Sequence, residues 1–260
     1  MELHFQAYGQ GEPLIILHGL FGSSDNWSSI SPKLAPYFRN FAVDLRNHGR
    51  SGHDPQMSYQ IMAEDLEEFF RLRKLDWAYV LGHSLGGKTA MQFALSYPQR
   101  VQKLIVLDIA PRPYPPYHKS ILSALLALDL RAYTNRKQIE DALAAAIPDL
   151  SVRQFLLKNL ARDSAGSLHW RLGLAEINQS YDRLCEGIRD KDRFDGPALF
   201  IRGESSTYLT MEDLPAIQRL FTRAELKTIP RAGHLAHVEN PSAFLKMTLE
   251  FLHNSDRKLD

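Results

Sequence analysis

Cysteine is almost missing from this chain, and so is an excess of charge of either sign. Cys185 is the only cysteine in 260 residues, so no disulfide can form within the chain, and cysteine usage gives no sign of secretion. Lys plus Arg number 31 and Asp plus Glu number 30, which leaves a formal net charge of +1. Such a balance provides no strong field to attract nucleic acid or an anionic membrane surface, so we expect neither as a partner.

Long hydrophobic runs are missing as well. The most apolar run, residues 14–17, is far shorter than the roughly 20 residues that a membrane-spanning helix needs. Residues 1–12 are polar and mixed, without the basic stretch and apolar core of a secretory signal. We therefore expect a cytoplasmic protein without membrane insertion, built as one large domain or as a domain with an insertion.

The chain does contain short apolar runs that alternate with helical patterns. Several of the runs, such as residues 14–17 and 198–201, are continuously apolar, which is typical of strands covered on both faces. Apolar spacing and boundary residues predict helices over residues 58–74, 84–97 and 241–252. Strands alternating with helices indicate an α/β fold with a mostly parallel central sheet and helices on both faces. The predicted strands cover residues 14–17, 38–44, 78–82, 104–108, 198–201 and 224–229.

Residues 110–195 break this rhythm, because no convincing strand occurs there. Four prolines open the segment, helical patterns follow at residues 120–130 and 138–146, and Gly196-Pro197 marks the return to sheet. A single crossover rarely needs more than about 30 residues, so a helical cap insertion over one edge of the sheet is favoured over ordinary crossover helices. The expected division is an α/β core in two parts, residues 1–110 and 196–260, with the cap at residues 111–195.

The strongest chemical motif is Gly-His-Ser-Leu-Gly over residues 82–86. Gly82, Ser84 and Gly86 fit G-x-S-x-G, and the motif follows a predicted strand and opens a predicted helix, as this motif requires. The glycines allow strand and helix to approach closely, and the turn exposes the Ser84 hydroxyl at the carboxyl edge of the sheet. Free amides at the start of the helix point to the same place, so we expect the Leu85 N–H to stabilise an oxyanion.

A second glycine-rich turn, His18-Gly19-Leu20-Phe21-Gly22, follows the first predicted strand. In folds with this type of serine turn, the loop after that strand supplies the other oxyanion donor. The backbone N–H of Leu20 is the candidate, and Phe21 is expected to line the pocket. Taken alone, the turn would be interpreted as a plain strand-to-helix connection; beside Ser84 the functional interpretation is favoured.

The base that activates the serine is expected to be His234. A serine hydroxyl is a poor nucleophile until a base takes its proton, and histidine is the usual base near neutral pH. Among ten histidines, His234 lies in a glycine loop after the last predicted strand and follows Ser84 in the expected order. His237 completes a His-x-x-His pair, but no cysteine or carboxylate cluster with ligand spacing accompanies it, so no metal and no cofactor are predicted. His18 and His83 are assigned structural roles as ring hydrogen-bond partners of loops.

The acid that orients His234 has two candidates. Asp108 ends one predicted strand, and Glu204 follows Gly203 at the end of another. Three residues after that glycine an aspartate is common, but here the residue is Ser206, which carries no charge to stabilise an imidazolium. We favour Asp108 and keep Glu204 as the rival, although each could be an ordinary turn-capping or solvated loop carboxylate. The polar turn at residues 44–51 is interpreted as a structural network near the nucleophile.

On these motifs the chain resembles the α/β-hydrolase superfamily over nearly all of its length, and within it the small esterases of the YbfF type. The resemblance implies hydrolysis of esters or acyl thioesters, and it supports an acid after the earlier strand, which matches Asp108. The motifs that carry it are His18-Gly19-Leu20-Phe21-Gly22-Ser23, Asp44-Leu45-Arg46-Asn47-His48-Gly49, Gly82-His83-Ser84-Leu85-Gly86-Gly87-Lys88, Leu107-Asp108-Ile109-Ala110-Pro111 and Gly233-His234.

The expected function is a serine hydrolase that cleaves small-molecule carboxylic esters or acyl thioesters through Ser84, His234 and Asp108, with an acyl-enzyme. Two alternatives stay open: a carbon–carbon bond hydrolase or lyase of the same fold, and a non-catalytic ligand-binding relative. The motifs define neither the acyl chain nor the oligomeric state. Aromatic residues of the predicted cap could line an acyl pocket or pack in the core; they are Tyr114, Tyr117, Phe155 and Trp170.

Overall fold

The central feature of the computed structural model, which describes residues 1–188 and 192–253, is a seven-stranded sheet with strand order β1-β3-β2-β4-β5-β8-β9. β1 pairs with β3 antiparallel, and every other neighbouring pair in this sheet is parallel. The strands are β1 (Phe5–Tyr8), β2 (Pro13–Leu17), β3 (Arg39–Val43), β4 (Ala78–His83), β5 (Val101–Leu107), β8 (Phe194–Gly203) and β9 (Phe221–Ile229).

The predicted mostly parallel α/β sheet is confirmed, and all six predicted strands fall on observed ones. The sequence analysis missed β1. Its residues, Phe-Gln-Ala-Tyr, are exposed or half-buried at the edge of the sheet, so they form no continuous apolar run. None of the four residues of this edge strand is fully buried, so the signal of a strand covered on both faces is missing.

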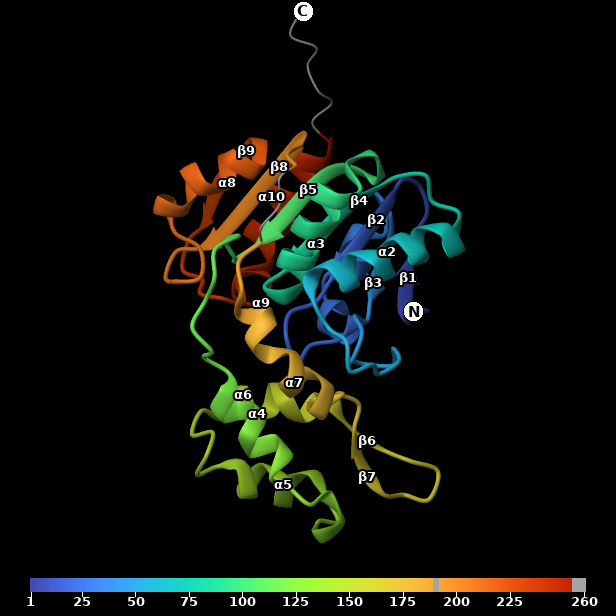
Figure 1. Cartoon of the computed structure of the whole chain (residues 1–260), viewed down its shortest axis with the longest axis vertical. Helices are drawn as coiled ribbons and strands as arrows, with labels where there is room; N and C mark the ends of the chain where they lie inside the picture. Colours follow the sequence, from blue (N-terminus) through green and yellow to red (C-terminus); the bar gives the residue numbers. More distant parts are fainter. Residues whose placement is uncertain (189–191, 254–260) are drawn as a thin grey trace, which may run out of the picture.

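Helices cover both faces of the sheet, as Figure 1 shows. Successive strand residues point to opposite faces. Val80 therefore packs in the core under α2 and α3, while Leu81 packs in a second core with α1 and α10. The helices outside the β5–β8 connection are η1 (Ser24–Trp27), α1 (Ser31–Leu34), α2 (Tyr59–Arg73), α3 (Leu85–Ser96), η2 (Pro98–Arg100), η5 (Met211–Asp213), α8 (Leu214–Leu220), α9 (Ala236–Glu239) and α10 (Pro241–His253).

Local capping explains where the predicted helices begin. The Ser58 hydroxyl accepts the Ile61 amide at 3.2 Å at the start of α2. The Asn240 side chain accepts the Ala243 amide at 3.3 Å, directly before Pro241 opens α10. These contacts satisfy amides that have no intrahelical acceptor, so α2 begins directly after Ser58 and α10 directly after Asn240.

The connection between β5 and β8 lies beyond the carboxyl end of the parallel strands, in the lower half of Figure 1. It is mainly helical, as predicted, but it also contains a short hairpin that the sequence analysis did not find. The two hairpin strands pair antiparallel, with Leu160 opposite Trp170 and Arg162 opposite Leu168. Each strand has only three residues, which is too few to form a recognisable apolar run. The elements are α4 (Lys119–Leu126), η3 (Leu130–Ala132), α5 (Arg136–Leu143), α6 (Leu150–Leu156), η4 (Leu157–Asn159), β6 (Leu160–Arg162), β7 (Leu168–Trp170) and α7 (Leu174–Cys185).

In the described part of the chain, none of the helices combines the length and the apolar character needed to cross a bilayer.

Candidate active site

Ser84 lies on a strained turn between β4 and α3. Its backbone has φ 52° and ψ −114°, and its amide donates to the Leu107 carbonyl at 3.0 Å. A left-handed φ is unfavourable for a residue with a side chain, so the surrounding structure must enforce it. A Cβ on Gly82 would lie 2.1 Å from the Gly86 carbonyl oxygen, and one on Gly86 would lie 2.5 Å from the His18 carbonyl oxygen. The turn therefore requires glycine at both motif positions.

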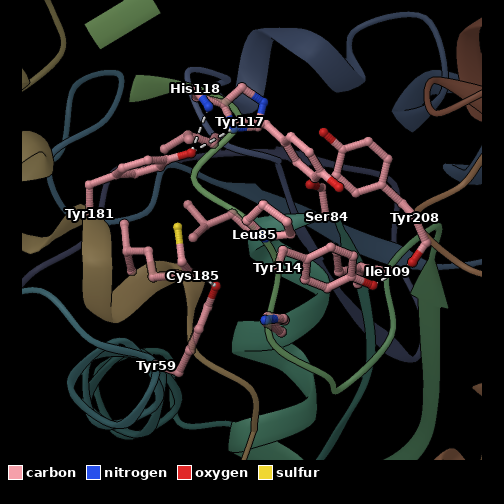
Figure 2. Close-up of a pocket in the computed structure, with 14 residues that line it drawn as sticks. Tyr59, Ser84, Leu85, Ile109, Tyr114, Tyr117, His118, Tyr181, Cys185 and Tyr208 are labelled. Atoms are coloured by element: carbon pink, nitrogen blue, oxygen red, sulfur yellow. Dashed lines mark hydrogen bonds between the residues drawn. The ribbon is translucent and has the colours of Figure 1, made fainter. Parts of the chain in front are cut away.

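Two cavities meet at Ser84. The larger has a volume of about 320 Å³ and is also lined by His234 and Phe155. The smaller, of about 60 Å³, is also lined by Tyr59 and Lys88, and Figure 2 shows its residues around Ser84. The serine hydroxyl is thus the point from which a bound molecule can extend in two directions.

Asp108 and His234 are brought into direct contact. The Nδ1–H of His234 donates to Oδ2 of Asp108 at 2.8 Å. Asp108 is fully buried at the end of β5, with φ 53°, and its carboxylate also accepts the Gly203 amide at 2.9 Å and the Ser206 hydroxyl. His234 follows β9 and is partly exposed to the larger cavity. Two residues far apart in sequence are therefore in contact at the carboxyl edge of the sheet, and His234 lines the larger cavity together with Ser84.

Glu204, the rival acid, is placed elsewhere. It is exposed, and its Oε2 accepts the Arg231 amide at 2.7 Å, where it fixes the loop before His234. Ser206 was considered in the sequence analysis only as a position without a charge. In the structure its hydroxyl donates to Asp108. The only local hint of this contact is the position of Ser206 three residues after Gly203.

The two candidate oxyanion donors flank the serine. A Cβ on Gly19 would lie 3.3 Å from Ser84 Cβ, so the backbone after β2 runs directly against the serine. Leu20 is the next residue, and Leu85 is the first residue of α3, where an amide has no intrahelical acceptor. Both leucines line the smaller cavity together with Ser84, and Phe21 lines the larger one, as expected.

Buried histidines hold the surrounding loops, which confirms the structural interpretation of His18 and His83. His18 Nδ1–H donates to the Gly19 carbonyl at 2.8 Å, while Nε2 accepts the Leu45 amide at 3.0 Å. His83 Nε2–H donates to the His234 carbonyl at 2.9 Å. Burial lowers the pKa of His18 and lowers that of His83 well below its ordinary value, so both rings are neutral near pH 7.

The polar turn at residues 44–51 also forms a structural network, as interpreted. Asp44 Oδ1 accepts the Ser24 amide at 2.5 Å, and Oδ2 accepts the Arg50 amide at 2.9 Å. His48 Nε2 accepts the Phe21 amide at 3.2 Å, which ties this turn to the loop that carries Leu20.

Two residues near the base were missed by the sequence analysis. The ring of Tyr208 stacks on His234, with centroids 4.0 Å apart. His118 lines both cavities, and burial lowers its pKa to about 4, which keeps it neutral. Neither residue belongs to a recognisable motif, so only the folded chain brings them to the site.

The aromatic residues of the predicted cap divide between pocket and core. Tyr114 and Tyr117 line the smaller cavity, and Phe155 lines the larger. Trp170, on β7, instead packs against the hydrophobic core.

The His-x-x-His pair lies beside His83, whose ring centroid is 4.7 Å from that of His234 and 5.0 Å from that of His237. His237 is buried, its ring stacks on Trp27 with centroids 4.5 Å apart, and burial lowers its pKa to about 3. Within residues 1–188 and 192–253, no group of three or more His, Cys, Asp or Glu side chains is arranged to hold a metal ion.

Comparison with known proteins places these features in a family. Residues 12–141 match the family described as alpha/beta hydrolase fold. The chain is 36% identical to the sn-1-specific diacylglycerol lipase ABHD11 of Danio rerio, over 95% of this chain and 80% of that one. It is 32% identical to Esterase YbfF of Escherichia coli, over 96% of each. A solved structure titled "Marine microorganism esterase" superposes with a TM-score of 0.94 at 45% identity, over 96% of this chain and 99% of that one.

Proposed function

The chain belongs to the α/β-hydrolase fold family, and from this membership we propose that it is a serine hydrolase of carboxylic esters in which Ser84, His234 and Asp108 form the catalytic triad. The observation that carries the proposal is the 2.8 Å hydrogen bond from His234 to the buried Asp108, beside a serine held in a strained turn at the junction of two cavities. Relatives named as esterases and a lipase support ester hydrolysis as the general reaction.

The proposed mechanism follows from the state of His234. Because its Nδ1–H is donated to Asp108, its Nε2 is left as the base. Nε2 takes the proton from Ser84 as the hydroxyl oxygen attacks the carbonyl carbon, and the Leu20 and Leu85 amides stabilise the oxyanion. The imidazolium then gives this proton to the departing alkoxide oxygen, which leaves an acyl-enzyme. Water, deprotonated by the same nitrogen, releases the acid and restores Ser84.

Acyl thioesters fit the same chemistry, since their carbonyl carbon is attacked in the same way and a thiolate leaves in place of an alkoxide. We also propose that residues 111–195 act as a cap over a core made of residues 1–110 and 196–260. In support, the larger cavity is bordered by Ile121 and Phe155 from the cap and by Trp27 and His234 from the core.

The proposal is tested by hydrolysis of a short and a long p-nitrophenyl ester and of an acyl-CoA. We expect Ser84→Ala to abolish turnover and Asp108→Asn to lower kcat by up to about 10⁴-fold, because the histidine loses its orienting carboxylate. Glu204→Gln is the matched control, because the Glu204 carboxylate lies in the same region and accepts the Arg231 amide. Its kcat should stay within about threefold of the wild-type value.

Different outcomes separate the parts of the proposal. A large loss in Glu204→Gln with little loss in Asp108→Asn would overturn the assignment of the acid and leave the hydrolase proposal intact. If the wild type cleaves none of the three substrates, the ester hydrolase proposal fails, and carbon–carbon bond hydrolysis or ligand binding without turnover takes its place.

A further inference from the structure

Lys88 is a buried cation one helical turn after the candidate nucleophile. It lies on α3, is 2% exposed, and lines the smaller cavity together with Ser84. Its Nζ donates to the Glu186 carbonyl at 2.6 Å and lies 5.4 Å and 4.8 Å from the ring centroids of Tyr59 and Tyr114. The proposed triad mechanism assigns no step to this ammonium group.

The groups around Lys88 are aromatic rings, a thiol and a backbone carbonyl. Among the described residues that line the smaller cavity, none is an aspartate or glutamate. The Tyr59 hydroxyl donates to the Leu184 carbonyl at 2.6 Å, and the Tyr114 hydroxyl donates to the Tyr208 carbonyl, so both are already engaged. The Glu186 carbonyl takes one of the three donors of the ammonium group. A charge buried in this way is unfavourable unless an anion accompanies it.

The position of His234 indicates which part of a substrate would reach Lys88. A general acid must lie within hydrogen-bond reach of the oxygen that it protonates. His234 lines the larger cavity and is not among the residues that line the smaller one. The leaving alcohol therefore lies in the larger cavity, and the acyl chain extends from Ser84 into the smaller cavity, toward Lys88.

We propose that the smaller cavity is an acyl subsite in which Lys88 binds a carboxylate at the far end of a short acyl chain. The preferred substrates are then half-esters, or half-thioesters, of short dicarboxylic acids. Ser84 and Lys88 are four residues apart on one helix face, about 6 Å along the axis, which suits an acyl group of succinyl or glutaryl length. This inference rests on the proposed hydrolase function and specifies its substrate class.

A purely structural role is the competing explanation. The Glu186 carbonyl directly follows α7, so Lys88 could simply hold the end of this helix against the core. Lys103 has that arrangement elsewhere: it is buried, and its Nζ donates to the Phe251 and Leu252 carbonyls of α10 at 3.0 Å and 2.9 Å. Lys103 does not line either cavity at Ser84, which makes it a matched control.

The test compares ethanol release from monoethyl glutarate, which is anionic, and from ethyl hexanoate, a neutral ester of similar length. We expect the wild type to prefer monoethyl glutarate. Lys88→Met should lower kcat/KM for monoethyl glutarate by about ten- to hundredfold, the usual effect of a lost charge-assisted hydrogen bond, and change ethyl hexanoate by less than about threefold. Lys88→Arg should retain part of the preference, and Lys103→Met should leave the ratio of the two substrates unchanged.

An equal loss on both esters in Lys88→Met would assign Lys88 the structural role and overturn the proposal, as would a wild-type preference for ethyl hexanoate. If Lys88→Met does not fold, inhibition of the wild type decides: glutarate must inhibit more strongly than pentanoate, and equal inhibition contradicts the subsite. If the wild type cleaves a p-nitrophenyl ester but not monoethyl glutarate, the subsite proposal fails and the hydrolase proposal stands. If it cleaves neither the ethyl esters nor the p-nitrophenyl esters and acyl-CoA, the proposed hydrolase function itself fails.

The pH dependence of the wild type gives a readout that a structural role would not produce. Burial lowers the pKa of Lys88 to about 8, so raising the pH through 8 removes the charge and should reduce the preference for monoethyl glutarate. Taking the ratio of the two substrates cancels every pH effect on the steps that both reactions share. Tyrosine hydroxyls and a cysteine thiol also line the smaller cavity, and burial raises the pKa of each of them; these residues are Tyr59, Tyr114, Tyr181 and Cys185. A ratio that stays constant from pH 7 to pH 9 contradicts the proposal.

Discussion

Asp108 shows at the residue scale how a buried carboxylate is satisfied. Its side chain has no exposed surface and accepts hydrogen bonds from the His234 ring, the Gly203 amide and the Ser206 hydroxyl. Donors on all of these sides compensate the loss of water around the charge and fix the direction in which it faces His234. Ser206 therefore positions the carboxylate of Asp108. From the sequence it was interpreted only as a position where an aspartate is common and absent here.

Because Ser206 lies so close to the Asp108 carboxylate, we expect that an aspartate at position 206 can take over its contact with His234. We expect Ser206→Ala to lower kcat for a p-nitrophenyl ester by about three- to tenfold, because one hydrogen bond to Asp108 is lost. Asp108→Ser should be nearly inactive. The double variant Asp108→Ser with Ser206→Asp should recover at least about tenfold of that loss, because it restores a carboxylate within hydrogen-bond distance of the original one. A double variant no more active than Asp108→Ser would show that position 206 cannot reach His234.

The turn between β4 and α3 is the feature at the element scale that determines where the serine lies. Strand and helix approach so closely that a Cβ on Gly82 would overlap the Gly86 carbonyl and the Gly87 amide nitrogen, both of which are backbone atoms. Backbone cannot rotate away as a side chain can, so the whole turn would have to shift.

This close approach predicts that Gly82→Ala is destabilising. We expect the free energy of unfolding to fall by about 1–3 kcal/mol, as for other overpacked sites, with loss of ester hydrolysis as Ser84 shifts. Gly52→Ala is the control, because its Cβ would meet only the flexible Met1 side chain, at 3.4 Å, and should change stability by no more than about 0.5 kcal/mol. Urea denaturation of both variants checks the prediction, which fails if Gly82→Ala is as stable as Gly52→Ala.

Burial explains most of the strand predictions, although the partly buried edge strand β9 was also predicted, over residues 224–229. The strands β2, β4 and β5 are covered on both faces, so they appear as unbroken apolar runs. β1 and the hairpin β6–β7 were missed, because an edge strand and two three-residue strands are only partly buried. Their formation depends on pairing with segments distant in sequence or on a tight turn, neither of which periodicity detects.

The larger cavity belongs to the whole molecule, because no single segment encloses it. Phe155 on α6 and Ile121 on α4 face Trp27 and Leu235 from the part of the chain that carries the sheet. The space available to a substrate is therefore set by how these two parts pack against each other.

Shortening Phe155 should change the size of alcohol that is accepted. We expect Phe155→Ala to raise the ratio of kcat/KM for octyl butanoate to that for ethyl butanoate by about three- to tenfold, because more apolar surface of the longer alcohol can be buried. Leu150→Ala is the control: Leu150 is 47% exposed on the same helix and does not line the cavity. An unchanged ratio in Phe155→Ala would place the alcohol elsewhere.

The sequence alone determined the class of fold, the serine turn and the histidine loop, because these depend on local patterns: continuous apolar runs, glycines that permit close approach, and residues at strand ends. Only the tertiary structure brought Asp108 onto His234, with Glu204 turned to the Arg231 amide, and placed Tyr208 and His118 around the base. The same holds for Lys88, which is buried beside Ser84 by the Glu186 carbonyl and by the rings of Tyr59 and Tyr114. Contacts between segments a hundred residues apart leave no local pattern, because they depend on how the strands and helices pack in three dimensions.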